Sequence, residues 1–165
     1  METKMEFLYL STVKQMSYNE ISEKLGVEKT PLSKWWEELK VERGKISKIR
    51  ILYNRKKFKK LTFPEFYDWY QSQNKQCYYC GLTENEIKKL IEMGSIKTVR
   101  LVTRGRSLEL ERRVPKPKND YEDIDNLVLS CYWCNSSKSD EFTEDEFKPI
   151  GILFGKIWKN RLKSI

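Results

Sequence analysis

Four cysteines in two closely spaced pairs constrain the fold of this chain more than any other feature. The pairs are Cys77-x-x-Cys80 and Cys131-x-x-Cys134, and they use every cysteine in the sequence. Two such pairs can supply the four thiolates of a tetrahedral structural Zn²⁺ site. The chain has no histidine, so a zinc site here would be made of sulfur alone. The alternative is that the cysteines are reactive or incidental.

Positive charge is concentrated in one central segment. Residues 1–39 hold five Lys and seven Glu, and residues 61–165 hold seventeen basic and sixteen acidic residues. Residues 40–60 hold ten Lys or Arg and one Glu, so they carry the whole surplus behind the net charge of +8. Such a basic segment favours contact with a polyanion through phosphate neutralisation. The alternative is an ordinary solvated helix face. Candidate DNA contacts in it are Arg55, Lys56 and Lys57.

The composition is that of a globular protein, with 39% hydrophobic and 34% charged residues. We find no apolar run long enough to cross a bilayer and no apolar stretch of a signal peptide at the N-terminus. We therefore expect a cytoplasmic protein with no membrane partner. Cysteines in that reducing compartment favour metal binding over disulfides.

Four Ser/Thr-x-x-Glu patterns predict helix starts as capping boxes, at Ser17, Thr62, Thr83 and Thr143. The dipeptide Thr30-Pro31 predicts another start, because proline suits the first helical position. Helices are thus expected to begin near residues 18, 31, 63, 84 and 144, with a further helix over residues 5–15. Residues 40–60 fit either a helix or an irregular linker.

Alternating or β-branched residues predict three strands, at Thr98–Val102, Ser107–Arg113 and Leu127–Ser130. The C-terminal segment has apolar residues at helical spacing. Pro149 and Gly151 are expected to kink or delay that helix.

Residues 17–39 carry a helix, a glycine turn at Gly26 and a second helix from Thr30-Pro31. This pattern resembles the helix-turn-helix family, which places its second helix in the DNA major groove. The resemblance implies groove contacts from Lys29, Thr30, Ser33 and Lys34, and from Glu37 as a further candidate, whereas Trp35 or Trp36 serves the core. The alternative is a helical packing domain or one that binds another protein.

The interval between the cysteine pairs ends with the segment 107–115, then Tyr121, and then Asn126 through Lys138 in the order Asn-Leu, Cys-x-x-Cys-Asn and Lys. This order resembles the HNH (ββα-metal) nuclease family over about residues 64–148. In that family a hairpin carries an Asp-His pair, and Cys-x-x-Cys-Asn/His opens the following helix.

The resemblance implies a role for each matching residue. Glu111 stands at the metal-binding acid, Asn135 at the second ligand, and Asn126 at the asparagine that braces the loop. Lys138 stands near a phosphate-contacting lysine. A carboxylate and an amide oxygen suit a catalytic Mg²⁺ or Mn²⁺. Arg104 and Arg106 precede the hairpin as further candidate phosphate contacts.

Arg112 occupies the place of the family's general-base histidine, and a protonated guanidinium cannot accept a proton. Three interpretations remain open. Arg112 could clamp the scissile phosphate while Glu109 or Tyr121 activates water. The strand could instead be shifted, so that Glu109 is itself a ligand. In the third, the site is inactive and only DNA binding persists.

The sequence thus predicts an α+β protein with a helix-turn-helix bundle followed by a zinc-stapled ββα-metal nuclease domain. The expected division is a DNA reader over 1–40, a basic connector over 41–61 and a nuclease domain over 62–165. The expected function is metal-dependent hydrolysis of double-stranded DNA, in restriction, phage defence or a mobile element. The alternatives are an inactive DNA-binding regulator and a nuclease or toxin directed at RNA. A homodimer would place two sites on opposite strands, although nothing in the sequence fixes it.

Overall fold

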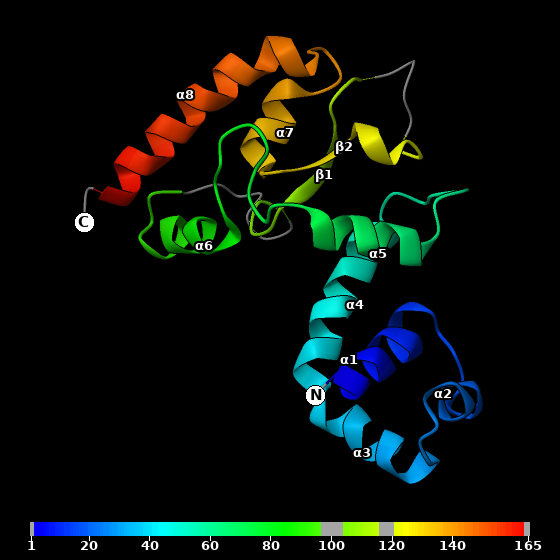
Figure 1. Ribbon diagram of the computed structural model, residues 1–165. Coiled ribbons are helices and arrows are strands. Elements are labelled where there is room, and N and C mark those ends of the chain that lie inside the picture. Colours follow the sequence, from blue (N-terminus) through cyan, green and yellow to red (C-terminus); the bar gives the residue numbers. More distant parts are fainter. Residues whose placement is uncertain (1, 97–103, 116–120, 164–165) are drawn as a thin grey trace. The chain divides into compact units, whose positions relative to one another are not determined.

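A computed structural model describes residues 2–96, 104–115 and 121–163 (Figure 1). It divides the chain into two compact units, Met1–Gln71 and Ser72–Ile165. The described helices of the first unit are joined by turns and loops, without a strand among its described residues, and the second unit combines helices with a two-stranded sheet. None of the described helices combines the length and the apolar character needed to span a membrane. The expected strand at Thr98–Val102 lies outside the described residues.

The first unit consists of five α-helices and one π-helical turn. In chain order they are α1 (Glu2–Leu8), η1 (Tyr9–Val13), α2 (Tyr18–Leu25), α3 (Lys29–Glu38), α4 (Lys40–Asn54) and α5 (Phe63–Ser72). Helices therefore begin at or near the expected positions 18, 31 and 63. Residues 40–60, which fitted either helix or linker, form helix α4 over most of their length.

Local signals explain the junction between α2 and α3. Ser17 and Glu20 form the complete capping box at the start of α2. Gly26 ends the helix in the left-handed conformation, with φ 62°, which a residue with a side chain adopts only at a cost. Phe7, Ile21 and Leu32 then meet in one buried core. The two helices and the turn between them are thus fixed by capping and by burial together.

Aromatic packing explains why α5 belongs to the first unit. Tyr53 at the end of α4 contacts Phe58, Phe63 and Phe66, with ring centroids 5.0 to 5.4 Å apart. The division after Gln71 therefore falls later than the expected boundary before residue 62. The capping box at Thr62 starts a helix that completes the first unit's core, and it does not open the second unit.

The second unit is built around a short hairpin. Its elements are α6 (Glu84–Glu92), β1 (Glu109–Arg112), the 3₁₀ turn η3 (Ile124–Asn126), β2 (Leu127–Ser130), α7 (Tyr132–Lys138) and α8 (Glu144–Lys163). The strands pair antiparallel, with Glu109 opposite Ser130 and Arg112 opposite Leu127. Figure 1 shows α7 following β2 directly, with α8 beside it. Strands, helix starts at 84 and 144, and the β-β-α order match the sequence expectations.

Helix α8 runs without interruption from Glu144 to Lys163, so the expected delay at Pro149 and Gly151 is wrong. Pro149 is the sixth residue of α8, so it removes one backbone hydrogen bond and its ring crowds the carbonyl four residues earlier, and the helix continues despite this cost. Gly151 is needed for packing, because a Cβ there would lie 2.6 Å from the Cβ of Tyr79. Gly155, one turn later, leaves the same room for the backbone of Cys80. Two small residues thus let α8 lie directly on the segment that holds the first cysteine pair.

Candidate active site and metal centre

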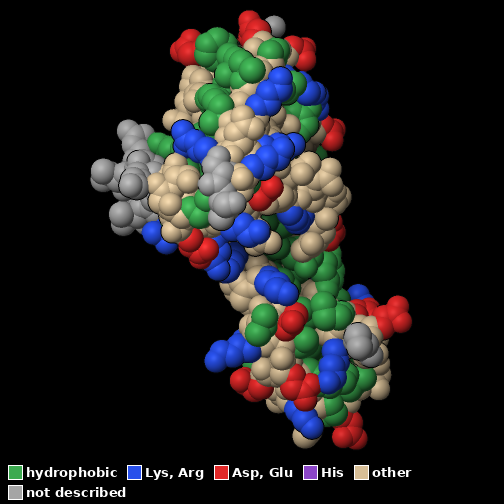
Figure 2. All heavy atoms as spheres, turned by 90° about the vertical axis from the view of Figure 1, so that its left-hand side faces the viewer, with side chains coloured by type: hydrophobic (Ala, Val, Ile, Leu, Met, Phe, Trp, Pro, Cys, Tyr) green, Lys and Arg blue, Asp and Glu red, His purple; other side chains and the backbone are tan. Residues whose placement is uncertain are grey.

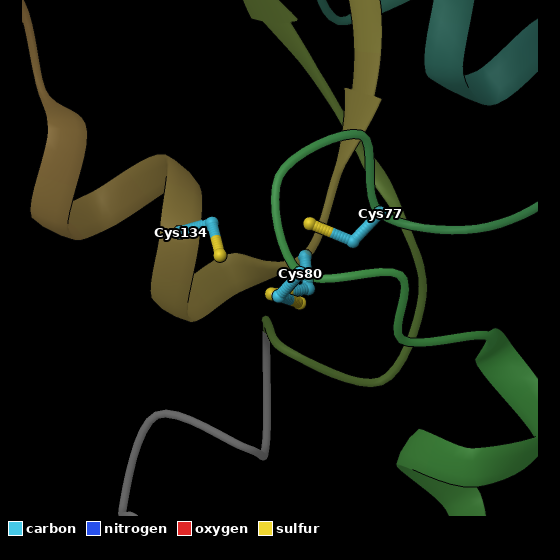
Figure 3. A group of neighbouring side chains, drawn as sticks. Cys77, Cys80 and Cys134 are labelled. Carbon is cyan, nitrogen blue, oxygen red and sulfur yellow. The ribbon is translucent and has the colours of Figure 1, made fainter. Parts of the chain in front are cut away.

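The four cysteines meet in one buried cluster. Their sulfur atoms all lie within 4.8 Å of one another, and all four are free thiols. Figure 3 shows Cys77 and Cys80 reaching from one loop toward Cys134 on α7. The cluster has the ligand number, the ligand type and the spacing that suit a closed structural zinc site.

Backbone hydrogen bonds explain how the first cysteine pair is presented. The Gly81 N–H donates to the Cys77 carbonyl at 2.8 Å, and Gly81 has a φ of 72°. The Tyr78 N–H donates to the Leu129 carbonyl at 2.8 Å, which ties this turn to strand β2. Cys131 directly precedes α7 and Cys134 lies in its first turn. The hairpin and both cysteine pairs are therefore one connected structure.

Both glutamates of β1 contact side chains of α7. The Asn135 Nδ2 donates to the Glu109 Oε2 at 2.8 Å. The Lys138 ammonium lies 3.4 Å from the Glu111 Oε1. Alternate residues of a strand share a face, and residues three apart in a helix share a side, so the two pairs line one strand-helix interface. Within it, the closest partner of Asn135 is Glu109, while Glu111 pairs with the lysine.

Lys138, expected to contact a phosphate, has an internal partner instead. Its side chain is 0% exposed and that of Glu111 is 5% exposed. Burial raises the pKa of Glu111, against the opposing attraction of Lys138. The ammonium therefore balances a carboxylate that would otherwise be expensive to keep charged in the interior. A DNA phosphate has no access to Lys138 in this arrangement.

Arg112 has partners outside the two strands. Its guanidinium forms an ion pair with Asp140, which follows α7, and lies 4.7 Å from the ring centroid of Tyr121. The Arg112 side chain is 4% exposed, whereas that of Asp140 is 57% exposed. Tyr121 and Asp140 thus hold the guanidinium in place. Of the two, sequence reasoning singled out Tyr121 only. Asp140 was missed because an exposed acid after a helix carries no motif.

Arg104 is tied to the same group of side chains. Its Nε donates to the Glu109 Oε1 at 2.9 Å, and a second ion-pair contact joins the two side chains. Its guanidinium also lies 5.0 Å from the ring centroid of Tyr132. Arg106 is exposed. Glu109 therefore bridges an arginine before the hairpin and the amide of Asn135.

A second polar cluster, also missed from the sequence, closes the other end of the hairpin. Glu144, at the start of α8, pairs with Arg113 and accepts a hydrogen bond from the Tyr78 hydroxyl. This hydrogen bond to a carboxylate raises the pKa of Tyr78. The cluster fastens α8 to the hairpin and to the cysteine turn.

Asn126 braces the segment that follows β1. The Val114 N–H donates to its Oδ1 at 2.8 Å, and its Nδ2 donates to the Val114 carbonyl at 3.1 Å. The residue is 6% exposed. The amide thus satisfies a backbone donor and a backbone acceptor at once.

Replacing Asn126 by alanine is expected to lower the free energy of unfolding by about 1–3 kcal/mol, because two backbone groups lose their partner. Urea unfolding of the wild type and the variant measures the difference. Asp125→Ala, at the exposed neighbouring position, is the matched control. Equal effects of the two substitutions would argue against the bracing role.

The residues predicted to contact DNA in the first unit are exposed. Lys29, Thr30, Ser33 and Lys34 lie on α3 with Glu37. Trp35 and Trp36 pack against the core. In the basic segment, Arg55 and Lys57 are exposed and Lys56 is half-buried, whereas Arg43 and Arg50 stack on Trp36 and Phe63. Figure 2 shows Lys and Arg side chains over much of the face that it draws. The positive segment thus serves partly internal packing and partly the surface.

No protein-family model and no curated protein matches the chain. Among solved structures, the chain is similar to PacI, a rare-cutting HNH restriction endonuclease that perturbs DNA. The two share 25% sequence identity and a TM-score of 0.50, and the match covers 70% of this chain and 77% of that one. The resemblance to HNH nucleases and the α+β fold class expected from the sequence are confirmed.

Proposed function

We propose that this chain, which has an HNH-type nuclease fold, hydrolyses phosphodiester bonds of double-stranded DNA with a divalent metal ion. The observation that carries the proposal is the strand-helix interface between β1 and α7. There, two glutamates lie on the strand and an asparagine follows the last cysteine on the helix. The similarity to an HNH restriction endonuclease supports a nuclease role at the level of the family.

The side chains at this interface fit a hard divalent cation. Carboxylate and amide oxygens are the ligands that Mg²⁺ and Mn²⁺ prefer. Glu111 and Asn135 are the proposed ligands, and Glu109 lies beside them because it accepts a hydrogen bond from Asn135. When bound, the ion would stabilise the negative charge that develops on the leaving 3′-oxygen and on the phosphoryl group during hydrolysis. Lys138 pairs with Glu111 in this structure, so the carboxylate would have to exchange that partner for the ion.

Arg112 is the proposed phosphate clamp. Its guanidinium now pairs with one oxygen of the Asp140 carboxylate, and a guanidinium can bind two oxygens of a phosphate. DNA binding would then exchange one anion for another at a pre-positioned arginine. Glu109 is the proposed acceptor of the proton from the attacking water, with Tyr121 as the other candidate. The water oxygen bonds to phosphorus, and the bond to the leaving 3′-oxygen breaks.

The first unit is the proposed DNA reader. Its α2-turn-α3 arrangement leaves the predicted contact residues Lys29, Thr30, Ser33 and Lys34 exposed on one helix. That is the arrangement required of a recognition helix in the major groove. Exposed residues of the basic segment, with Arg104 and Arg106 in the second unit, would add contacts to phosphates. The proposed biological setting is restriction, another defence against phage, or a mobile element.

Cleavage assays on plasmid and genomic DNA test this function. The zinc-loaded protein is incubated without added divalent ion, with Mg²⁺ or with Mn²⁺. We expect metal-dependent cutting, and a loss of at least about a hundredfold in rate for Glu111→Gln. Glu141→Gln, an exposed acid just after α7, is the matched control and should cut normally.

Three results would each contradict a different part of this proposal. Salt-sensitive DNA binding without cutting on any substrate would favour the inactive regulator. Undiminished cutting by Glu111→Gln, with Glu109→Gln inactive, would move the essential acid to Glu109 and support the shifted-strand interpretation. If the protein cut RNA and no DNA, its substrate would be RNA in place of the proposed double-stranded DNA.

A further inference from the structure

Helix α8 carries a second apolar stripe that the core of its own unit leaves exposed. Ile150, Leu153 and Ile157 are 37%, 56% and 46% exposed. Their spacing of three and four residues places them on one side of the helix. The core contacts come from a different side, which carries the buried residues Phe147, Gly151, Gly155 and Trp158. The helix is therefore apolar on two sides, and an exposed apolar stripe of this kind marks an interaction surface.

The charges along α8 indicate what covers this stripe. The first turn of the helix is acidic, with Glu144, Asp145 and Glu146, and its last turn is basic, with Arg161 and Lys163. A helix with acid at one end and base at the other complements an antiparallel copy of itself. We propose that a second copy of this chain docks on the stripe, so that two α8 helices pair antiparallel about a twofold axis.

One register satisfies the apolar and the charged residues together. When Ile150 of each copy lies opposite Ile157 of the other, Leu153 and Phe154 meet at the axis. The same register places Glu146 of each copy opposite Arg161 of the other. Both residues are exposed at the ends of the stripe. Their contacts within the unit use the Nη1 of Arg161, which donates to the Ser95 carbonyl, and the Oε2 of Glu146, which accepts from Thr143. A twofold interface must be self-complementary. In this register the sequence of α8 meets that requirement.

The α8 pair is independent of catalysis, since it uses no residue of the proposed metal or phosphate site. Sedimentation of the zinc-loaded full chain therefore tests it separately from cleavage. We expect the wild type to sediment as a dimer at micromolar concentrations. Leu153→Glu is expected to weaken the dimer by at least about tenfold in dissociation constant, because it places like charges at the axis.

Ile152→Glu is the matched control. Ile152 is 52% exposed on the same helix, close to the 56% of Leu153, but it lies on a different side. This variant is expected to stay dimeric. A monomeric wild type would overturn the proposal, and so would equal weakening by the two glutamates, which would indicate another surface on α8.

Cysteine cross-linking tests the antiparallel α8 pair without the Leu153→Glu variant, in case that variant fails to fold. Leu153→Cys is expected to give a disulfide-linked dimer under mild oxidation, because the two copies of the residue meet near the axis. Ile152→Cys is expected to remain uncross-linked. Equal cross-linking of both variants, or of neither, would contradict the antiparallel α8 pair.

Discussion

Removing zinc from the protein is expected to unfold residues 72–165 and to leave residues 1–71 folded. The four thiols join the turn before α6 to the start of α7, and the hairpin lies between them. Structural zinc contributes about 10–16 kcal/mol in small zinc domains. A whole domain is stable by only about 5–15 kcal/mol. The second unit, with its short sheet, should therefore depend on the ion for its fold.

Hydrogen exchange resolved by peptide measures this outcome directly. After chelation, peptides from the second unit should lose protection, while peptides covering the core of Phe7, Ile21 and Leu32 should keep it. Cys134→Ser should reproduce the effect without a chelator. A protein shown by metal analysis to be free of zinc, yet protected throughout, would refute a structural role for the site.

The second large effect is expected from Gly155→Ala. The added Cβ would lie 2.6 Å from the carbonyl oxygen of Cys80, which is backbone held in the cysteine turn. Neither group can move away without shifting α8 or the turn. We expect a loss of about 1–3 kcal/mol. For a unit of this size, each kcal/mol corresponds to a fall of roughly 4–8 °C in Tm. Thermal unfolding of the zinc-loaded protein measures it.

Gly44→Ala is the control for this substitution. Gly44 lies within helix α4, and a Cβ there would meet nothing within 4 Å. The change should stabilise the first unit by about 0.4–1 kcal/mol, since alanine has less conformational freedom to lose on folding. If both alanines raised Tm, the close approach of α8 to Cys80 would not constrain the fold.

Local signals account for the part of the fold that the sequence predicts well. Capping boxes at Ser17 and Thr83 form as expected, and the strand at Leu127–Ser130 has the expected bounds. The spacing within each cysteine pair predicts two ligand-bearing turns, and the fold brings the two turns together. The capping boxes and the strand depend on residues close together in the chain.

The structure differs from the sequence-based predictions where contacts between residues far apart in the chain determine the position of a side chain or the length of a helix. Nothing in the spacing shows that Lys138 is buried against Glu111, since a lysine is usually exposed. The partnership of Arg112 with Asp140 likewise depends on how the chain leaves α7. Helix α8 continues through Pro149 because its start is capped at Thr143 and its glycines pack on the cysteine turn. Such outcomes depend on packing that no local pattern encodes.

The placement of the cysteine pairs on both sides of the hairpin also bears on how this protein can change over time. The chain from Cys80 to Cys131 is a loop fastened at both ends, and it contains β1 and all the residues between the two pairs. Because the four thiols lie at or beyond the two ends of this loop, substitutions at its exposed positions leave the thiol cluster itself unchanged. A lineage could therefore exchange a histidine for an arginine in that loop, and with it the chemistry, while inheriting the same scaffold.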